Sequence, residues 1–219
     1  MDEKKTKVLK SIRPWRDAFY YQKAEALYQL TYVFCQRFLP QHGDRTVDQM
    51  VQAARSGKQN IIEGTEDGTT SIEMHIKLLN VSRSSLQELR EDYRDFLISR
   101  SLTIWTVEHD RYARMQEFCK MHNRFEDYQP YFKIWDAEEM ANVALTLCYM
   151  IDAMLNHQLK ALEGEFVTQG GIKERMYAAR TAYRREQDAE LASLRQEAAA
   201  LRREEERLRS ILSHNGIDY

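Results

Sequence analysis

The stretch from Gln49 to Leu97 constrains the fold more than any other part of the chain. Apolar residues recur there at three- and four-residue steps on both sides of a short polar turn, residues 65–69. That spacing matches the period of about 3.6 residues of an α-helix and places the apolar side chains of each segment on one face. The stretch therefore predicts two amphipathic helices, 44–63 and 70–97, joined as a hairpin.

Two local signals predict how this hairpin turns. Gly64 follows the last apolar residues of the first segment, and glycine readily adopts the left-handed conformation that ends many helices. Thr70 and Glu73 match a capping box, in which a hydroxyl and a carboxylate satisfy free amides at the start of a helix. We therefore expect Asn60, Glu63 and Gly64 to be structural residues that close the corner.

Two further segments have the same helical periodicity, residues 17–39 and 136–162. Pro40 breaks the chain after the first of them. Glycine and proline are scarce, with 8 and 3 residues among 219, which favours long helices over a sheet with many turns. We predict an all-α fold in which an antiparallel four-helix bundle spans residues 17–163, after a flexible lead-in at residues 1–16.

An aromatic-rich insertion, residues 101–135, separates the third and fourth predicted helices. Asp136 with Glu139 forms a second box-like start where the insertion ends. The aromatic side chains either cover the end of the bundle, which is their usual role, or form a platform for stacking or partner docking. The aromatic residues concerned are Trp105, Tyr112, Phe118, Phe125, Tyr128, Tyr131, Phe132 and Trp135.

The last segment, residues 171–213, predicts one long charged helix after the Gly170-Gly171 break. Its apolar residues follow a heptad pattern over about three heptads, and all three d positions are leucine. Glu205 occupies an a position and weakens the pattern. The helix either forms a coiled coil, with itself or with a partner, or is a solvated helix that lies on the bundle. The predicted coiled-coil seam contains Leu191, Leu194, Leu201, Leu208 and Leu212.

Charge, cysteine content and hydropathy predict a cytoplasmic protein. The formal net charge is −2, which gives no overall attraction to nucleic acid. The three cysteines are widely spaced and odd in number, as expected of small buried apolar residues in a reducing compartment. The sequence has no apolar run long enough for a transmembrane helix and no apolar signal core, so we expect neither membrane insertion nor secretion.

Catalytic and metal-binding patterns are sparse, so we expect no enzyme activity, no metal and no cofactor. The histidines are scattered, and no HExxH, paired CxxC or glycine-rich phosphate loop appears. The hairpin carries Glu63 and Glu88 beside Arg55 and Arg83. These four side chains suggest an ion-pair network that holds the hairpin rather than acid–base catalysis, which needs a pocket and shifted pKa values.

Nucleic acid remains a possible partner through local basic residues. Glutamates lie around the basic pairs near the end of the chain and would weaken attraction to phosphate. The candidate contacts are Arg45, Arg55, Lys58, Arg83, Arg184, Arg185, Arg202 and Arg203.

Residues Asp48 to Leu97 resemble the bacterial four-helix bundle protein family, which includes rRNA intervening-sequence proteins and accessory proteins of diversity-generating retroelements. The resemblance rests on the string Asn60-Ile61-Ile62-Glu63-Gly64 after a helix with small residues, and it is closest to the suffix-type branch. Val51 and Gln52 stand where many members carry a basic pair. The structural signature that carries the resemblance is Gln49, Ala53, Ser56, Asn60, Glu63, Gly64, Ser85 and Glu88.

The resemblance implies a ring-forming bundle, typically a homopentamer, and nucleic-acid or reverse-transcriptase binding in the retroelement members. We predict a non-enzymatic oligomeric scaffold or adaptor that recruits a protein or self-associates through its C-terminal helix. The alternative is a nucleic-acid-binding accessory protein that acts with a reverse transcriptase or another nucleic-acid enzyme.

Overall fold

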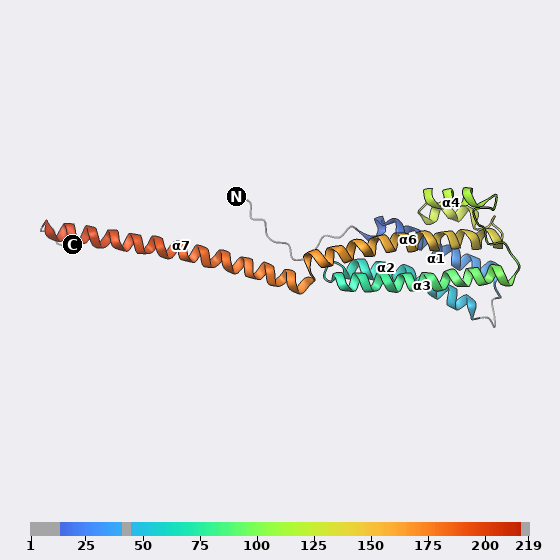
Figure 1. The fold of residues 1–219 in the computed structure, drawn as a ribbon, viewed down its shortest axis with the longest axis horizontal. Helices are drawn as coiled ribbons and strands as arrows, with labels where there is room; N and C mark the ends of the chain where they lie inside the picture. The colour runs from blue at the N-terminus through green and yellow to red at the C-terminus, as the bar shows by residue number, and fades with distance from the viewer. Residues whose placement is uncertain (1–13, 41–44, 216–219) are drawn as a thin grey trace. The chain divides into compact units, whose positions relative to one another are not determined.

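The computed structural model describes residues 14–40 and 45–215, and every regular element in these ranges is helical (Figure 1). The predicted all-α class is confirmed for this part of the chain. Most of the predicted lead-in, residues 1–13, lies outside the described residues. The elements are η1 Trp15–Asp17, α1 Phe19–Phe38, α2 Thr46–Asp67, α3 Ile72–Ser99, α4 Tyr112–Met121, α5 Phe125–Tyr128, η2 Gln129–Tyr131, α6 Ala137–Gln169 and α7 Ile172–His214.

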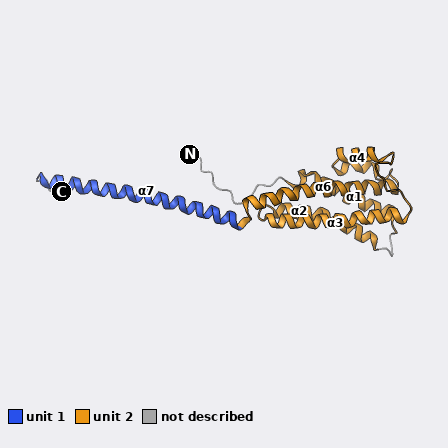
Figure 2. Cartoon of the chain, in the orientation of Figure 1, with its two compact units in different colours: residues 1–8, 173–219 blue, residues 9–172 orange. Residues whose placement is uncertain are grey.

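The chain divides into two compact units, which Figure 2 shows in different colours. One unit spans Leu9–Ile172 and contains η1 to α6; we call its described part the helical body. The other unit contains α7 from Lys173 onward. The two units are described separately below.

Four long helices of the helical body share one hydrophobic core. Helix α1 packs against α2 and α6, and α3 packs against the same two helices. Burying each large apolar side chain stabilises the fold by about 1.5–3 kcal/mol, so this core supplies most of the favourable free energy. Its fully buried residues include Leu27, Leu30, Phe34, Met50, Ile61, Leu79, Leu86, Leu89, Tyr93, Leu147, Ile151 and Leu155.

The corner between α2 and α3 differs from the prediction. Helix α2 continues through Gly64 to Asp67, so Gly64 does not end the helix. Among the described glycines, a positive φ occurs at Gly170 and not at Gly64. A Cβ atom at Gly64 would lie 3.1 Å from Cβ of Leu78 on α3. Glycine is needed there because the two helices approach closely, not because the chain turns.

The start of α3 also lies one residue later than predicted. Ser71 is the N-cap, and its Oγ accepts a hydrogen bond of 3.2 Å from the amide of Met74. Thr70 instead donates its hydroxyl to the carbonyl of Asp67 at 2.9 Å, which ties it to the end of α2. The predicted Thr70–Glu73 capping box is therefore wrong, although a hydroxyl residue still caps the helix.

Helix α6 begins as predicted and ends later. The amide of Glu139 donates to Asp136 at 2.8 Å, and the amide of Asp136 donates to Glu139 at 3.2 Å, which completes the capping box. The helix passes through Gly164 and stops at Gly170, whose φ of 68° lies in the region that favours glycine. The break expected at Gly170-Gly171 is thus confirmed, whereas the predicted end near residue 162 was seven residues short.

Two cations of α1 hold the insertion, residues 101–135, against the long helices of the helical body. Lys23 is fully buried, and its Nζ donates to the backbone carbonyls of Cys119 and His122, at the C-terminal end of α4. An ammonium group at this end of a helix also meets the negative end of the helix dipole. Arg37 donates to the carbonyl of Phe132 farther along the insertion.

The aromatic residues of the insertion are mixed in exposure. Trp105, Tyr128 and Phe132 are buried, in agreement with the expectation that they cover part of the core. Tyr131 is 38% exposed and stacks on Trp135, with ring centroids 5.0 Å apart. Covering the core is therefore the role that the buried aromatic side chains perform in this structure.

The predicted burial of the three cysteines is confirmed. Cys35, Cys119 and Cys148 are all buried, and none of the three forms a disulfide bond in the described structure. Burial raises the pKa of each thiol to about 12, because the thiolate would lose its hydration.

Replacing two helical glycines by alanine should change stability in opposite directions. A Cβ atom at Gly57 would lie 2.5 Å from Cδ2 of the buried Leu86, so Gly57→Ala should destabilise the body by about 1–3 kcal/mol. Gly164 has open space around it, so Gly164→Ala should stabilise α6 by about 0.5–1 kcal/mol. Urea unfolding of both variants measures the difference, and equal effects would contradict this account of the α2–α3 contact.

Replacing Lys23 by methionine should loosen the insertion. The change keeps an unbranched apolar chain but removes the donor from the buried carbonyl of Cys119, at a cost of about 1–3 kcal/mol, while the carbonyl of His122 keeps the hydroxyl of Tyr128 as a donor. Hydrogen exchange followed by mass spectrometry should show faster exchange in α4 and α5 than in α2 and α3. Uniformly faster exchange throughout the helical body would show that Lys23 supports the whole core instead.

Candidate functional site

Helix α7 is the most exposed element of the described chain. It runs for 43 residues, and none of them is buried. Alanine, leucine, glutamate and arginine dominate its sequence, and glycine and proline are absent from Ile172–His214, so intrinsic propensity favours a helix. Ion pairs along its surface add local support, with Glu205 2.6 Å from Arg209 and Glu204 3.6 Å from Arg207.

The predicted heptad residues form an apolar stripe on this exposed helix. Leu191, Leu194, Leu201 and Leu208 are 46%, 55%, 66% and 52% exposed, and Leu212 is half-buried. We call the a and d positions from Leu191 to Leu212 the α7 seam. Exposing a stripe of leucines to water is unfavourable, whereas a second helix packed on the stripe would bury the whole row and lower the free energy. The seam is therefore the best candidate interaction surface in the described structure.

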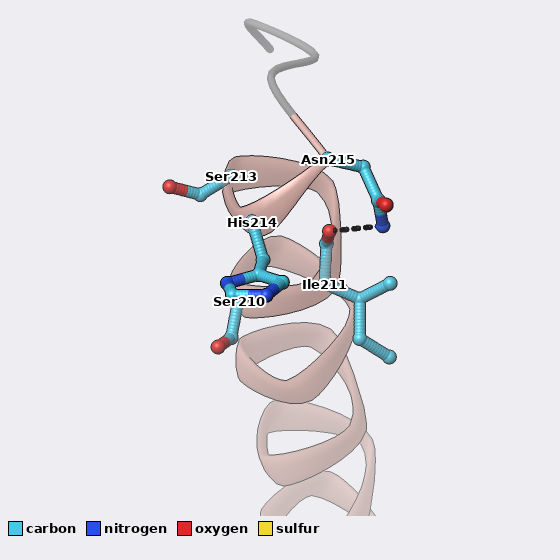
Figure 3. Close-up of a pocket in the computed structure, with 5 residues that line it drawn as sticks. All are labelled: Ser210, Ile211, Ser213, His214 and Asn215. Carbon is cyan, nitrogen blue, oxygen red and sulfur yellow. Dashed lines mark hydrogen bonds between the residues drawn. The ribbon is translucent and has the colours of Figure 1, made fainter.

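The last turns of α7 frame a shallow hollow of about 600 Å³ (Figure 3). Its lining comes from this one helix end, and the side-chain amide of Asn215 donates to the carbonyl of Ile211 at 2.8 Å. Figure 3 shows the side chains of Ser213 and Asn215 on opposite sides of the helix. The hollow does not bring a nucleophile, a base and an orienting group together, so it supports no catalytic reading.

Part of the structural signature lies in the contact between α2 and α3. Ser56 and Ser85 share a hydrogen bond of 3.0 Å between their hydroxyl groups. The side chain of Asn60 donates to the carbonyl of Ser56 at 2.8 Å and to its hydroxyl at 3.2 Å. Ser82, which the sequence analysis did not place in the signature, donates to the carbonyl of Gly57 at 2.7 Å. These short side chains satisfy one another where the helices are closest.

The other signature residues divide by exposure. Ala53 and Gly64 are buried, and Gly64 faces Leu78 of α3, whereas Gln49, Glu63 and Glu88 are exposed. Because their side chains are exposed, these last three do not line the α2–α3 interface. The signature therefore combines an interhelical contact with surface residues, and only the first group has a structural role that the geometry explains.

The predicted ion-pair network within the hairpin is wrong for Arg83. Its guanidinium pairs with Asp152 of α6 at 2.9 Å and not with Glu63 or Glu88. Arg83 therefore links α3 to α6. This partner lies 69 positions away in the chain and carried no signal in the sequence.

The candidate nucleic-acid contacts do not form one free basic surface on the helical body. Arg83 is engaged by Asp152, and the ammonium of Lys58 lies 4.5 Å from the ring centroid of Tyr28. Arg45, the N-cap residue of α2, and Arg55 within α2 are both exposed. On the separate α7 unit, the four predicted arginines are all exposed: Arg184, Arg185, Arg202 and Arg203. Nucleic-acid binding stays a prediction.

The sequence analysis missed a groove of about 630 Å³ in the helical body. Tyr20, Thr65, His75, His157 and Gln158 are among the residues that line it. His75 is only 3% exposed, and its Nε2 has no hydrogen-bond partner within residues 14–40 and 45–215. Burial lowers the pKa of His75, because the imidazolium would lose its hydration. The position of His75 between Ile72 and Leu79, on the apolar face of α3, was the available signal.

Metal and membrane sites find no support in the described residues. Residues 14–40 and 45–215 contain no group of three or more histidine, cysteine or acidic side chains placed to hold a metal ion. Within the same ranges, the structure has no helix that is both long and apolar enough to cross a membrane.

Comparison with protein-family models, with curated proteins and with solved structures finds no match. The resemblance to the bacterial four-helix bundle family therefore stays a prediction from residues 48–97.

Removing His75 should reduce the pH dependence of stability. Because its pKa is lower in the folded chain than in the unfolded chain, the unfolded chain binds one more proton between the two values. The free energy of unfolding of the wild type should therefore fall as the pH decreases below about 6.5, by about 1.4 kcal/mol for each unit by which the two pKa values differ. Urea unfolding of the wild type and of His75→Leu at several pH values measures the free energy of unfolding of each. If the free energies of the two proteins changed in parallel with pH, the expectation would be contradicted.

Proposed function

We propose that the protein is a non-enzymatic scaffold that self-associates through α7 and thereby brings copies of the helical body together. The observation that carries the proposal is the row of exposed leucines on a helix with no buried residue. We assign function to this surface for two reasons. The hollow at the end of α7 lacks a catalytic arrangement. In the helical body, the side chains of Lys23, Arg37 and Arg83 are engaged by partners within the body itself.

The physical argument rests on the difference between a solvated helix and an interacting one. A solvated helix is stabilised by ion pairs along its surface and needs no continuous apolar row. Helix α7 has such pairs at Glu204–Arg207 and Glu205–Arg209, and it carries the leucine row in addition. Pairing would bury each leucine against another helix and add about 1.5–3 kcal/mol per fully buried side chain.

In this proposal, association through α7 brings several copies of the helical body into one assembly. The mutual packing of α1, α2, α3 and α6 supports an antiparallel four-helix bundle, with the α4–α5 insertion on its surface. The family resemblance would add a ring of bodies, with a pentamer as its usual size. Pairing through α7 alone would instead produce a small assembly whose size depends on how many helices share the seam.

Lysine at two seam positions should dissociate the assembly. In Leu194→Lys/Leu201→Lys, two charged groups would enter the pairing surface and remove two leucines from it. The matched control, Ala192→Lys/Ala199→Lys, adds the same charges to exposed b positions outside the seam. Light scattering after size exclusion, at about 100 µM, should give masses above 26.0 kDa for the wild type and the control and 26.0 kDa for the leucine variant.

Two outcomes would overturn the proposed function. The first is a wild-type protein that elutes as a 26.0 kDa monomer at this concentration. The second is an assembly whose mass is unchanged in the leucine variant, since association would then depend on another surface. Circular dichroism of each variant checks that α7 stays helical.

A further inference from the structure

The charged residues beside the α7 seam follow a strict order. With Leu191 at a and Leu194 at d, every g position is glutamate and every e position is arginine over three consecutive heptads. The g residues are Glu190, Glu197 and Glu204, and the e residues are Arg195, Arg202 and Arg209. All six are exposed. A solvated helix needs charges of both signs but does not need them sorted to the two edges of an apolar row.

We propose that the α7 seam pairs with α7 of a second copy as a parallel, in-register, two-stranded coiled coil. This inference rests on the proposed function and specifies its partner and orientation. In a parallel pair, each g residue faces the e residue of the next heptad on the other helix. Glu190 then faces Arg195 of the partner subunit, and Glu197 and Glu204 face the partner's Arg202 and Arg209. Every one of these contacts is attractive, and symmetry repeats each contact on the other side.

The same charges oppose an antiparallel pair. In that orientation, g residues face g residues and e residues face e residues. Glutamate would meet glutamate along one edge, and arginine would meet arginine along the other. A single chain thus carries both halves of a complementary pattern, so a second copy is sufficient as a partner.

The N-terminal limit of the coil follows from the same register. Continuing the heptads upstream of Leu191 places Arg184 at a and Arg180 at d. In a parallel pair, these arginines would face their own copies, and like charges repel. The paired segment is therefore 191–212, a length of about 33 Å at about 1.5 Å per residue.

Glu205 favours two strands over three. It occupies an a position, where a two-stranded coil leaves room for a long polar side chain to reach water at the edge of the seam. Its carboxylate already pairs with Arg209 of the same helix at 2.6 Å. A third strand would enclose three such carboxylates. The charge at this layer weakens pairing but disfavours shifts in register that would place it against a leucine.

Disulfide trapping tests the orientation. We would make Leu191→Cys and Leu208→Cys separately in the full chain; the native Cys35, Cys119 and Cys148 are buried and should react slowly. In the parallel register each variant lies opposite its own copy, so each should form a covalent dimer alone. Antiparallel pairing would place residue 191 opposite residue 208, so a dimer that forms only after the two variants are mixed would overturn the proposal.

Charge reversal tests the complementarity. Arg195→Glu/Arg202→Glu/Arg209→Glu puts glutamate on both edges, and Glu190→Arg/Glu197→Arg/Glu204→Arg puts arginine on both. Each variant alone should associate at least about tenfold more weakly than the wild type, and an equimolar mixture should recover a heterodimer. Sedimentation of the separate and mixed variants measures this, with the effect decreasing at high salt.

The outcomes separate this inference from the proposed function. If the leucine variant dissociates but the charge variants associate as the wild type does, self-association through α7 stands and the parallel, charge-selected register is wrong. If the wild-type assembly has the mass of three chains, the two-stranded form is wrong. If the wild type is a monomer, the proposed function fails as well.

Discussion

The close approach of α2 and α3 is the contact on which the helical body depends. Gly57 faces the side chain of Leu86 so closely that a Cβ atom would lie 2.5 Å from it, and Gly64 faces Leu78 in the same way at 3.1 Å. Two backbones this near each other leave space only for short side chains. Hydrogen bonds from Ser82 to Gly57 and between Ser56 and Ser85 therefore satisfy the polar groups within the contact. Helices α1 and α6 then complete the core by packing on this pair.

The insertion is attached to the long helices of the helical body by a different kind of contact. Lys23 and Arg37 of α1 donate to the backbone carbonyls of Cys119, His122 and Phe132, which places two cations at backbone acceptors of the insertion. Burial lowers the pKa of Lys23, because the charged form loses hydration that the carbonyls only partly replace. The insertion is thus held by directed polar contacts as well as by the burial of Trp105 and Tyr128.

Helix α7 is built on the opposite principle from the body. The helical body buries most of its large apolar side chains in its own core. The leucines of α7 are instead exposed, with glutamates along one side of the row and arginines along the other. Apolar area supplies the driving force for helix pairing, and the charged edges select the orientation, since exposed ion pairs are individually weak. This division of roles explains why we place the proposed function on α7 and regard the α2–α3 signature as a packing feature.

The sequence by itself determined the features that depend on neighbours three or four residues apart. These are the periodic faces of the long helices, the Asp136–Glu139 capping box, the break at Gly170 and the heptad order of α7. Such features are local, because a helix brings residues i and i+4 together whatever surrounds it.

Only the tertiary structure decided the features that join distant residues. A glycine at this point of a sequence can serve either a turn or a close contact between helices. The position of Leu78 shows that Gly64 serves a close contact. Lys23 meets His122 across 99 positions, and Arg83 meets Asp152 across 69. His75 likewise becomes buried only after α3 packs against its neighbours, and its Nε2 then has no hydrogen-bond partner among the described residues. No periodic pattern encodes these partners, because they depend on how whole helices are placed against each other.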